Sequence, residues 1–195
     1  MFSKNTSEVD RKASTEILGI SRTMEFDSYL GLPLMFGRNK TKKLRFIKDR
    51  LWQKIQSWGA RLLSYAGRAV LIQAIGQATP LYVMSCFKLS RGFLNDLNMM
   101  LAGYWWGDKG SKKRIHWKNW EHLCCSKLDG GLGFRDFESF NLALLAKQWW
   151  RVLQNENSLC FKVLKSRYFP HLPAHRPGNV CNASYLWKSL MEGKK

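Results

Sequence analysis

The longest regular pattern of apolar positions begins a few residues after Arg38. Apolar residues recur there at steps of three or four over about five helical turns, at Leu44, Ile47, Leu51, Ile55, Trp58 and Leu62. A stripe with this spacing predicts an amphipathic helix that is buried along one side. Gly59 interrupts the pattern near its end. This is the strongest helical signal in the chain.

Two further helices are predicted over the next 45 or so residues. The second is expected to start at an N-cap, Ser64, and to end before Pro80, which lacks the N–H that a helix interior needs. The third follows Ser90 and carries its apolar residues at helical spacing, at Phe93, Leu94, Leu97, Met100, Leu101, Tyr104 and Trp105. Between them, the apolar run 81–88 fits either a strand or the continuation of a broken helix, because periodicity does not separate the two.

The composition of the sequence changes after Trp106, where glycine, basic and aromatic residues replace the periodic apolar pattern. A basic turn with aromatic residues (GDKGSKKRIHWKNW) leads to a glycine-rich loop at 129–133, and this change predicts a domain boundary. Helices are expected from an N-cap at Asp136 and again over 157–168, and another element begins at Tyr185. We therefore predict a mainly α fold: an N-terminal remnant (1–28), a helical bundle (29–107), and a smaller helical connector with short irregular or β segments (108–195).

Composition makes a folded chain with an anionic partner the simplest expectation. The 195 residues include nine Trp and eleven Phe, whereas disordered chains are poor in aromatic residues. Lys and Arg number 32 against 14 Asp and Glu, which gives a net charge of +18 and a pI near 10.0. This excess lies after residue 28, since the first 28 residues hold four basic and five acidic side chains. Such a charge points to nucleic acid or to an acidic membrane face.

Cysteine usage and hydropathy suggest the compartment. The five cysteines are odd in number and irregularly spaced, and no apolar run resembles a secretory signal or a membrane span. We expect reduced thiols in an intracellular, soluble protein that is not secreted.

The basic residues nearest the first helix are the candidate nucleic-acid contacts. On a helix Lys43, Arg50 and Lys54 share one edge of the apolar stripe and Arg45 and Lys48 the other. A solvated helix face is the alternative, but only Asp49 opposes these charges locally. The predicted phosphate-binding set is Arg38, Lys40, Lys42, Lys43, Arg45, Lys48, Arg50 and Lys54, with Lys112, Lys113 and Arg114 in the basic turn.

Other chemistry receives less support from the residues. Trp58, Trp105 and Trp149 lie at core spacing, which leaves Trp117 and Trp120, beside the basic turn, as candidates for stacking on unpaired bases. Cys160, His171, His175 and Cys181 include a His-x3-His spacing that is seen in zinc sites, but ten residues separate the first two and neither cysteine has a close Cys partner. No Lys-Ser or Lys-Thr follows the glycine loop. We therefore predict no metal site, no cofactor and no catalytic residue.

Several segments together carry a resemblance to a known family. They are YLGLP with GR (29–38), LSYAGRAVL (63–71), MSCFKL (84–89), YWWG (104–107), IHW (115–117), KLDGGLGF (127–134) and NLALLAKQWWR (141–151). In this order and spacing they resemble the reverse transcriptases of plant LINE-type (non-LTR) retrotransposons, in the region downstream of the polymerase active site.

The resemblance implies the end of the palm, the thumb and the following connector of an RNA-directed DNA polymerase. Such polymerases use two metal ions held by palm aspartates, including an adjacent Asp-Asp pair that lies upstream of this region. No two acidic residues are adjacent in this chain. The resemblance thus implies a truncated remnant without polymerase activity of its own. It also implies the nucleus as the compartment, with the mitochondrion as the alternative.

The expected partner is RNA, DNA or their hybrid, bound without sequence preference, and we expect neither a membrane nor a small-molecule substrate. A domesticated interaction or scaffold protein, whose basic surface meets another protein, is the alternative from a different class. An enzyme with an unrecognised site is the third possibility.

Overall fold

A computed structural model describes residues 7–19, 28–29, 32–33, 40–59, 63–108, 114–171 and 182–194, with the backbone alone at 28–29, 32–33 and 40–43. The chain divides into two units, Met1–Lys43 and Leu44–Lys195. Helices make up most of the described elements, which confirms the predicted mainly α fold.

Among its described residues, the first unit holds helix α1, two short strands and the backbone at the start of α2 (Lys40–Gly59). Helix α1 (Glu8–Ile17) begins at Ser7, whose Oγ accepts a hydrogen bond from the Asp10 N–H at 3.2 Å. No residue of α1 is buried. Strands β1 (Ser28–Tyr29) and β2 (Leu32–Pro33) pair antiparallel.

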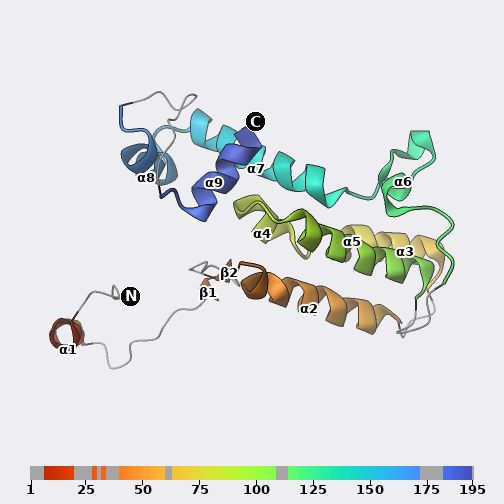
Figure 1. Cartoon of the computed structure of the whole chain (residues 1–195), viewed down its shortest axis with the longest axis horizontal. Coiled ribbons are helices and arrows are strands. Elements are labelled where there is room, and N and C mark those ends of the chain that lie inside the picture. Colours follow the sequence, from red (N-terminus) through yellow and green to blue (C-terminus); the bar gives the residue numbers. More distant parts are fainter. Residues whose placement is uncertain are drawn as a thin grey trace. The chain divides into compact units, whose positions relative to one another are not determined.

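The second unit is a succession of helices packed side by side (Figure 1). They are α2 (Lys40–Gly59, from Leu44 on), α3 (Tyr65–Leu71), the π-helical turn η1 (Ile72–Gly76), α4 (Leu81–Cys86), α5 (Arg91–Trp106), α6 (Trp120–Cys124), the 3₁₀ turn η2 (Lys127–Asp129), α7 (Phe137–Gln154), α8 (Leu159–Tyr168) and α9 (Tyr185–Lys194). Helix α7 packs against α4, α5, α8 and α9. Elements before and after the expected boundary at 107–108 are therefore in contact, and the three-part division stays a prediction.

The predicted helix starts have their physical basis in capping. The Oγ of Ser64 accepts from the Gly67 N–H at 3.3 Å, and Asp136 Oδ2 accepts from the Ser139 N–H at 2.9 Å. Such bonds satisfy backbone donors that the first helical turn leaves unpaired. Ser90 precedes α5 as expected, although its side chain makes no capping hydrogen bond.

The Asp136 cap also determines the charge state of its carboxyl group. Partial burial by itself raises the pKa of Asp136, but hydrogen bonds from Ser139 and Glu138 outweigh it, so the pKa lies below its usual value. A carboxylate at a helix N-terminus is further favoured by the helix dipole. The α7 cap therefore stays ionised, and its contribution to stability is lost only as the pH falls through this lowered pKa.

The second predicted helix is present but is not a uniform α-helix. After α3 the turn widens, and the Gln77 N–H donates to the carbonyl oxygen of Ile72, five residues earlier, at 2.8 Å. A Cβ at Gly76 would lie 2.7 Å from Leu101 Cδ2 of α5. The absent side chain thus allows η1 to lie directly on α5, and the π-helical turn adjusts the register at that contact.

The ambiguous run 81–88 is resolved in favour of a helix. Helix α4 follows Pro80 directly, and Phe87 then adopts an extended conformation (φ −134°, ψ 140°). Proline fits a helix start because the first turn has no use for its missing N–H. Val83 and Met84 are buried, so the apolar character of the run reflects packing rather than a strand.

The predicted apolar stripe forms one part of the core. Its members Leu44, Ile47, Leu51, Ile55 and Trp58 are all buried, and Leu62 lies outside the described residues. The Trp58 ring lies 5.3 Å from the Tyr104 ring of α5. This ring contact places the C-terminal part of the stripe against α5.

A second, aromatic part of the core joins the last three helices. It comprises Trp149, Val152, Phe161, Leu164, Tyr168, Phe169, Trp187 and Leu190. Tyr168 and Trp187 stack at 4.2 Å between ring centroids, and a Cβ at Gly193 would lie 2.6 Å from the Ala146 backbone nitrogen. Helix α9 can therefore lie very close to α7. Trp58, Trp105 and Trp149 are all buried, as predicted. Within the described ranges, none of the helices has both the length and the apolar content to cross a membrane.

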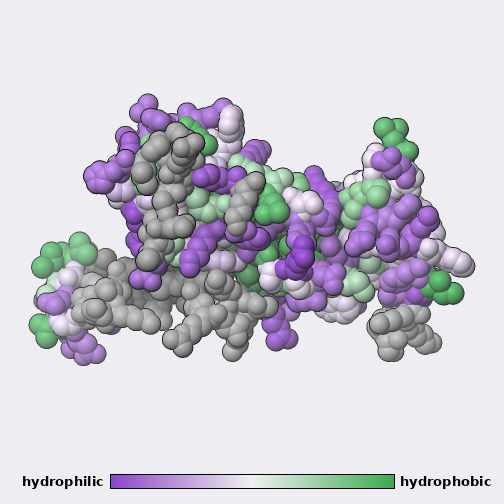
Figure 2. Space-filling model, turned by 45° about the horizontal axis from the view of Figure 1, so that its top comes forward, coloured by the Kyte–Doolittle hydropathy of each residue, from purple (hydrophilic) through white to green (hydrophobic). Residues whose placement is uncertain are grey.

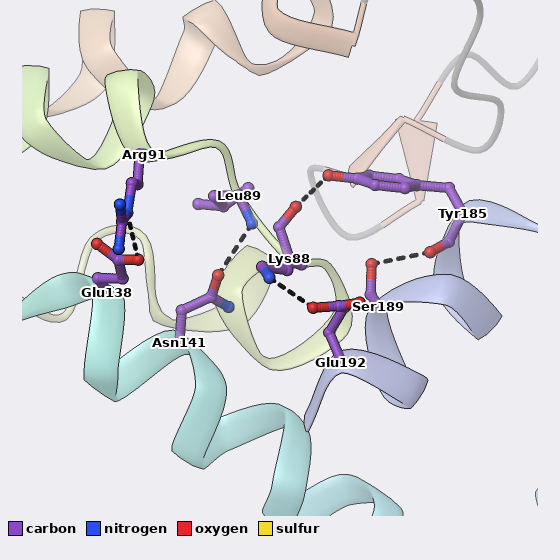
Figure 3. Close-up of polar contacts among 8 residues, drawn as sticks. All are labelled: Lys88, Leu89, Arg91, Glu138, Asn141, Tyr185, Ser189 and Glu192. Atoms are coloured by element: carbon purple, nitrogen blue, oxygen red, sulfur yellow. Dashed lines mark hydrogen bonds and ion pairs between the residues drawn. The ribbon is translucent and has the colours of Figure 1, made fainter. Parts of the chain in front are cut away.

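One buried amide connects α7 with the segment between α4 and α5 (Figure 3). Asn141 Oδ1 accepts from the Leu89 N–H at 2.9 Å, and its Nδ2 donates to the Met84 and Phe87 carbonyl oxygens at 2.7 and 3.0 Å. These backbone groups lie where α4 ends, so they have no helical partners. Asn141 is 1% exposed and supplies the partners itself.

Polar contacts at the edge of this junction extend it to α9. Lys88 Nζ pairs with Glu192 Oε2 at 2.7 Å, and Arg91 Nε with Glu138 Oε1 at 2.6 Å. The Tyr185 hydroxyl donates to the Lys88 carbonyl oxygen (Figure 3). Since the ion pairs are partly exposed, they contribute less to stability than the buried amide.

Replacing Asn141 by Ala should destabilise the protein by about 3 kcal/mol, because three buried backbone groups lose their partners. Urea unfolding followed by circular dichroism measures the change. Asn95→Ala, on the exposed side of α5, is the control and should change the free energy of unfolding by less than about 0.5 kcal/mol. Equal stability of the two variants would contradict this account of the junction.

Candidate nucleic-acid interface

The buried stripe of α2 determines where its basic side chains can lie. Since residues three, four or seven apart share a helix face, Arg50 and Lys54 lie along one edge of the stripe, and Arg45 and Lys48 along the other. We call these the Arg50 edge and the Lys48 edge. The structure gives them different surroundings.

Acidic side chains occupy the Lys48 edge. Lys48 Nζ forms an ion pair with Asp96 of α5, and it lies 5.0 Å from the centroid of the Phe93 ring. Arg45 Nε is 4.0 Å from Asp49 Oδ1, with the two side chains 78% and 63% exposed. An exposed pair of this length contributes little. The Lys48 charge is therefore largely compensated within the protein, and that of Arg45 is compensated in part.

The Arg50 edge is different. The Arg50 guanidinium lies 6.0 Å from the Phe46 ring centroid, and Lys54 Nζ is 3.4 Å from Thr79 Oγ1. Neither Arg50 nor Lys54 forms an ion pair with any residue that the structure describes. Arg50 and Lys54 thus place two positive charges one helical turn apart, and neither has an acidic partner among the described residues. This arrangement is suited to contacts with successive phosphates.

The other predicted contacts are only partly described. Arg38, Lys112 and Lys113 lie outside the described residues, and Lys40, Lys42 and Lys43 belong to the start of α2, where only the backbone is described. Arg114 is exposed, and its backbone N–H donates to Asp108 Oδ1 at 2.8 Å. The contacts described for Arg114 are at the end of α5, and none of them joins it to α2.

One basic residue that the sequence reasoning missed, Arg68 of α3, lies beside Arg114. Gly107 ends α5 at φ 80°, and a Cβ there would lie 3.1 Å from Arg68 Nη1 and 3.9 Å from Arg114 Cδ. Arg68 Nη1 also donates to the Trp105 carbonyl oxygen at 3.2 Å, where a cation complements the helix C-terminus. Arg68 is an isolated basic residue in a helix rich in small residues, so no local pattern marks it as part of a cluster.

The two tryptophans that were left open as stacking candidates have different environments. Trp120 stacks on Phe134, with ring centroids 5.2 Å apart and planes 20° from parallel, and it is half-buried. Trp117 is 76% exposed. Of the two, only Trp117 offers its ring to a ligand.

Comparison with known proteins places the chain in a family. It is 42% identical over 119 residues to the uncharacterized mitochondrial protein AtMg00310 of Arabidopsis thaliana, an alignment that covers 60% of this chain and 77% of that protein. The chain belongs to the same family as this mitochondrial protein. It is also 34% identical over 137 residues, 70% of this chain, to a protein of the same plant named "Putative ribonuclease H protein At1g65750". The alignment spans 22% of that relative's length. No protein-family model matches the chain.

In this family member, the described residues bring no three His, Cys, Asp or Glu side chains together in a geometry that could hold a metal ion. Cys160 and His171 are exposed, while His175 and Cys181 lie outside the described ranges. The glycine loop is a compact turn, closed by hydrogen bonds such as that from the Gly133 N–H to the Cys125 carbonyl oxygen at 2.9 Å.

The Cys124 thiol, next to this turn, is kept protonated. Burial is the main cause, and the nearby Asp136, Cys125 and Glu121 add to it, which raises the pKa of Cys124 to about 12. The thiolate is the nucleophilic form of cysteine. Cys124 is therefore poorly suited to nucleophilic catalysis near neutral pH.

Iodoacetamide at pH 8 should modify Cys124 much more slowly than the exposed Cys160, because almost no Cys124 is thiolate at that pH. The rate at Cys124 should keep rising with pH up to the highest pH at which the protein stays folded. Peptide mass spectrometry of time points gives both rates in one sample. A rate at Cys124 equal to that at Cys160 would refute the assignment.

Proposed function

We propose that the chain derives from a LINE-type reverse transcriptase, of which it holds the thumb and connector regions, and that it binds nucleic acid through the phosphate backbone. Three observations support this proposal: the order and spacing of the sequence segments that carry the resemblance, the helical fold, and a relative whose name assigns it to the ribonuclease H proteins. The name of the other relative supports the mitochondrion over the nucleus as the compartment.

The observation that carries the binding proposal is the contrast between the two edges of α2. Acidic side chains accompany the Lys48 edge, whereas Arg50 and Lys54 have no acidic partner among the residues described. A protein that neutralises phosphates with such cations releases condensed counterions, so affinity falls steeply with salt and depends little on sequence. Lys54 keeps donors available, because an ammonium has three and the contact with Thr79 uses one.

The double variant Arg50→Gln/Lys54→Gln should bind duplex and hybrid oligonucleotides more weakly than wild type. The slope of log affinity against log salt should fall by about 2, since each lost phosphate contact removes about 1. Fluorescence anisotropy titrations at several salt concentrations give this slope.

The matched control, Arg45→Gln/Lys48→Gln, removes the same charge from the other edge of the same helix and should leave the slope nearly unchanged. Equal losses in both variants would show a general charge effect and would overturn the assignment to the Arg50 edge. Wild-type binding that ignores salt would overturn backbone binding. A single protein recovered stoichiometrically after nuclease treatment would then favour the scaffold alternative.

We further propose that these 195 residues do not synthesise DNA on their own. By resemblance, the family's two-metal chemistry resides in palm aspartates that include an adjacent pair, and this sequence contains no two neighbouring acidic residues. A primer-extension assay with Mg²⁺ or Mn²⁺ should therefore give no incorporation above a heat-treated sample. Incorporation by the purified chain would overturn this part of the proposal.

A further inference from the structure

The segment 114–118 lies at the C-terminal end of α5, and His116 anchors it there. The His116 ring stacks on Trp106, with centroids 5.8 Å apart and planes 22° from parallel, and its Nε2 lies 3.2 Å from Asp108 Oδ2. The Arg114 N–H binds the other oxygen of the same carboxylate. Three contacts therefore fix this short irregular segment to the C-terminus of α5.

The residues on either side of His116 are apolar and exposed. Ile115 is 70% and Trp117 76% exposed. In the view of Figure 2, apolar groups of the second unit lie scattered among hydrophilic side chains. Two residues are too small a patch for a stable protein interface, which buries about 800 Å² on each partner.

Basic residues adjoin Trp117 in the sequence. Arg114, three residues before Trp117, converges with Arg68 at Gly107, and Lys118 follows Trp117 directly and is exposed. Asp108, an acidic residue that contacts this segment, is already engaged with His116 and with the Arg114 backbone. An exposed aromatic ring on an anchored segment, with positive charges next to it in the sequence, is a combination with which proteins bind single-stranded nucleic acid.

We propose that Trp117 stacks on an unpaired base of single-stranded RNA or DNA while Arg114 and Lys118 contact the neighbouring phosphates. This inference rests on the nucleic-acid binding proposed above and adds a base-dependent contact to it. Single strands are specified because the bases of a duplex are stacked on one another and do not offer a face to the indole. Trp58, Trp105, Trp149 and Trp187 do not compete for the role, because they are buried.

The test uses the full chain and three dye-labelled probes of equal length: a single strand, its duplex, and a single strand with abasic sites. Trp117→Ala should weaken binding of the normal single strand by about 5- to 150-fold, the loss that one stacked base represents. The affinity of the Trp117→Ala variant for the duplex and for the abasic strand should match that of wild type. Trp117→Phe should retain most single-strand affinity, because a phenyl ring still stacks.

Ile115→Ala is the matched control, since Ile115 is an exposed apolar residue (70%) of the same segment and has no ring that could stack on a base. It should bind all three probes like wild type. Thermal unfolding should be unchanged in the Trp117 variants, because the ring is not part of the core.

The outcomes separate this inference from the function on which it rests. If Trp117→Ala binds the normal single strand as tightly as wild type, or loses duplex affinity to the same extent, the stacking role is wrong and backbone binding stands. If wild type binds none of the probes at low salt, both proposals fail.

Discussion

The side-chain amide of Asn141 is the contact on which the joining of α4, α5 and α7 depends. Helix α4 has six residues, so most of its backbone groups lie at an end and need partners from outside the helix. Asn141 offers one acceptor and two donors within a small volume, and it binds the Leu89 N–H and two carbonyl oxygens together. An apolar residue of similar size would fill the space and leave these groups unpaired. Because α7 in turn packs on α9, the same amide helps to place the C-terminal aromatic core.

Patterns that depend on nearby residues predicted the fold well. The stripe from Leu44 to Trp58 is buried as its spacing indicated, and Ser64 and Asp136 begin helices because a cap acts on the three residues that follow it. Such local patterns did not decide the conformation of the run 81–88, and they did not predict the π-helical turn. Their conformations depend on contacts with distant elements, such as that of Gly76 with Leu101 of α5. The residues next to Gly76 in the sequence do not indicate which helix packs against it.

The same distinction applies to the candidate interface. Helical spacing separated the two edges of α2, but it gave no means of knowing that Asp96, 48 residues from Lys48, pairs with one of them. Likewise, Trp117 and Trp120 stand in the same basic, aromatic segment, and Phe134 beyond the glycine loop covers only Trp120. Arg68 and Arg114, far apart in the sequence, both lie beside Gly107, which ends α5 at a positive φ.

Packing of apolar side chains stabilises the fold of this protein, whereas most of its positive charge does not. Burial of apolar and aromatic side chains, with the Asn141 amide, holds the helices together, and the ion pairs of Lys48, Lys88 and Arg91 engage acids on other helices. Most of the 32 basic residues have no such task, since only 14 acidic residues are available to oppose them. A charge of +18 is costly to a compact fold through self-repulsion, and an anionic partner that binds the folded state reduces that cost. The excess charge that weakens the isolated chain is thus the same property that would favour its binding to a polyanion.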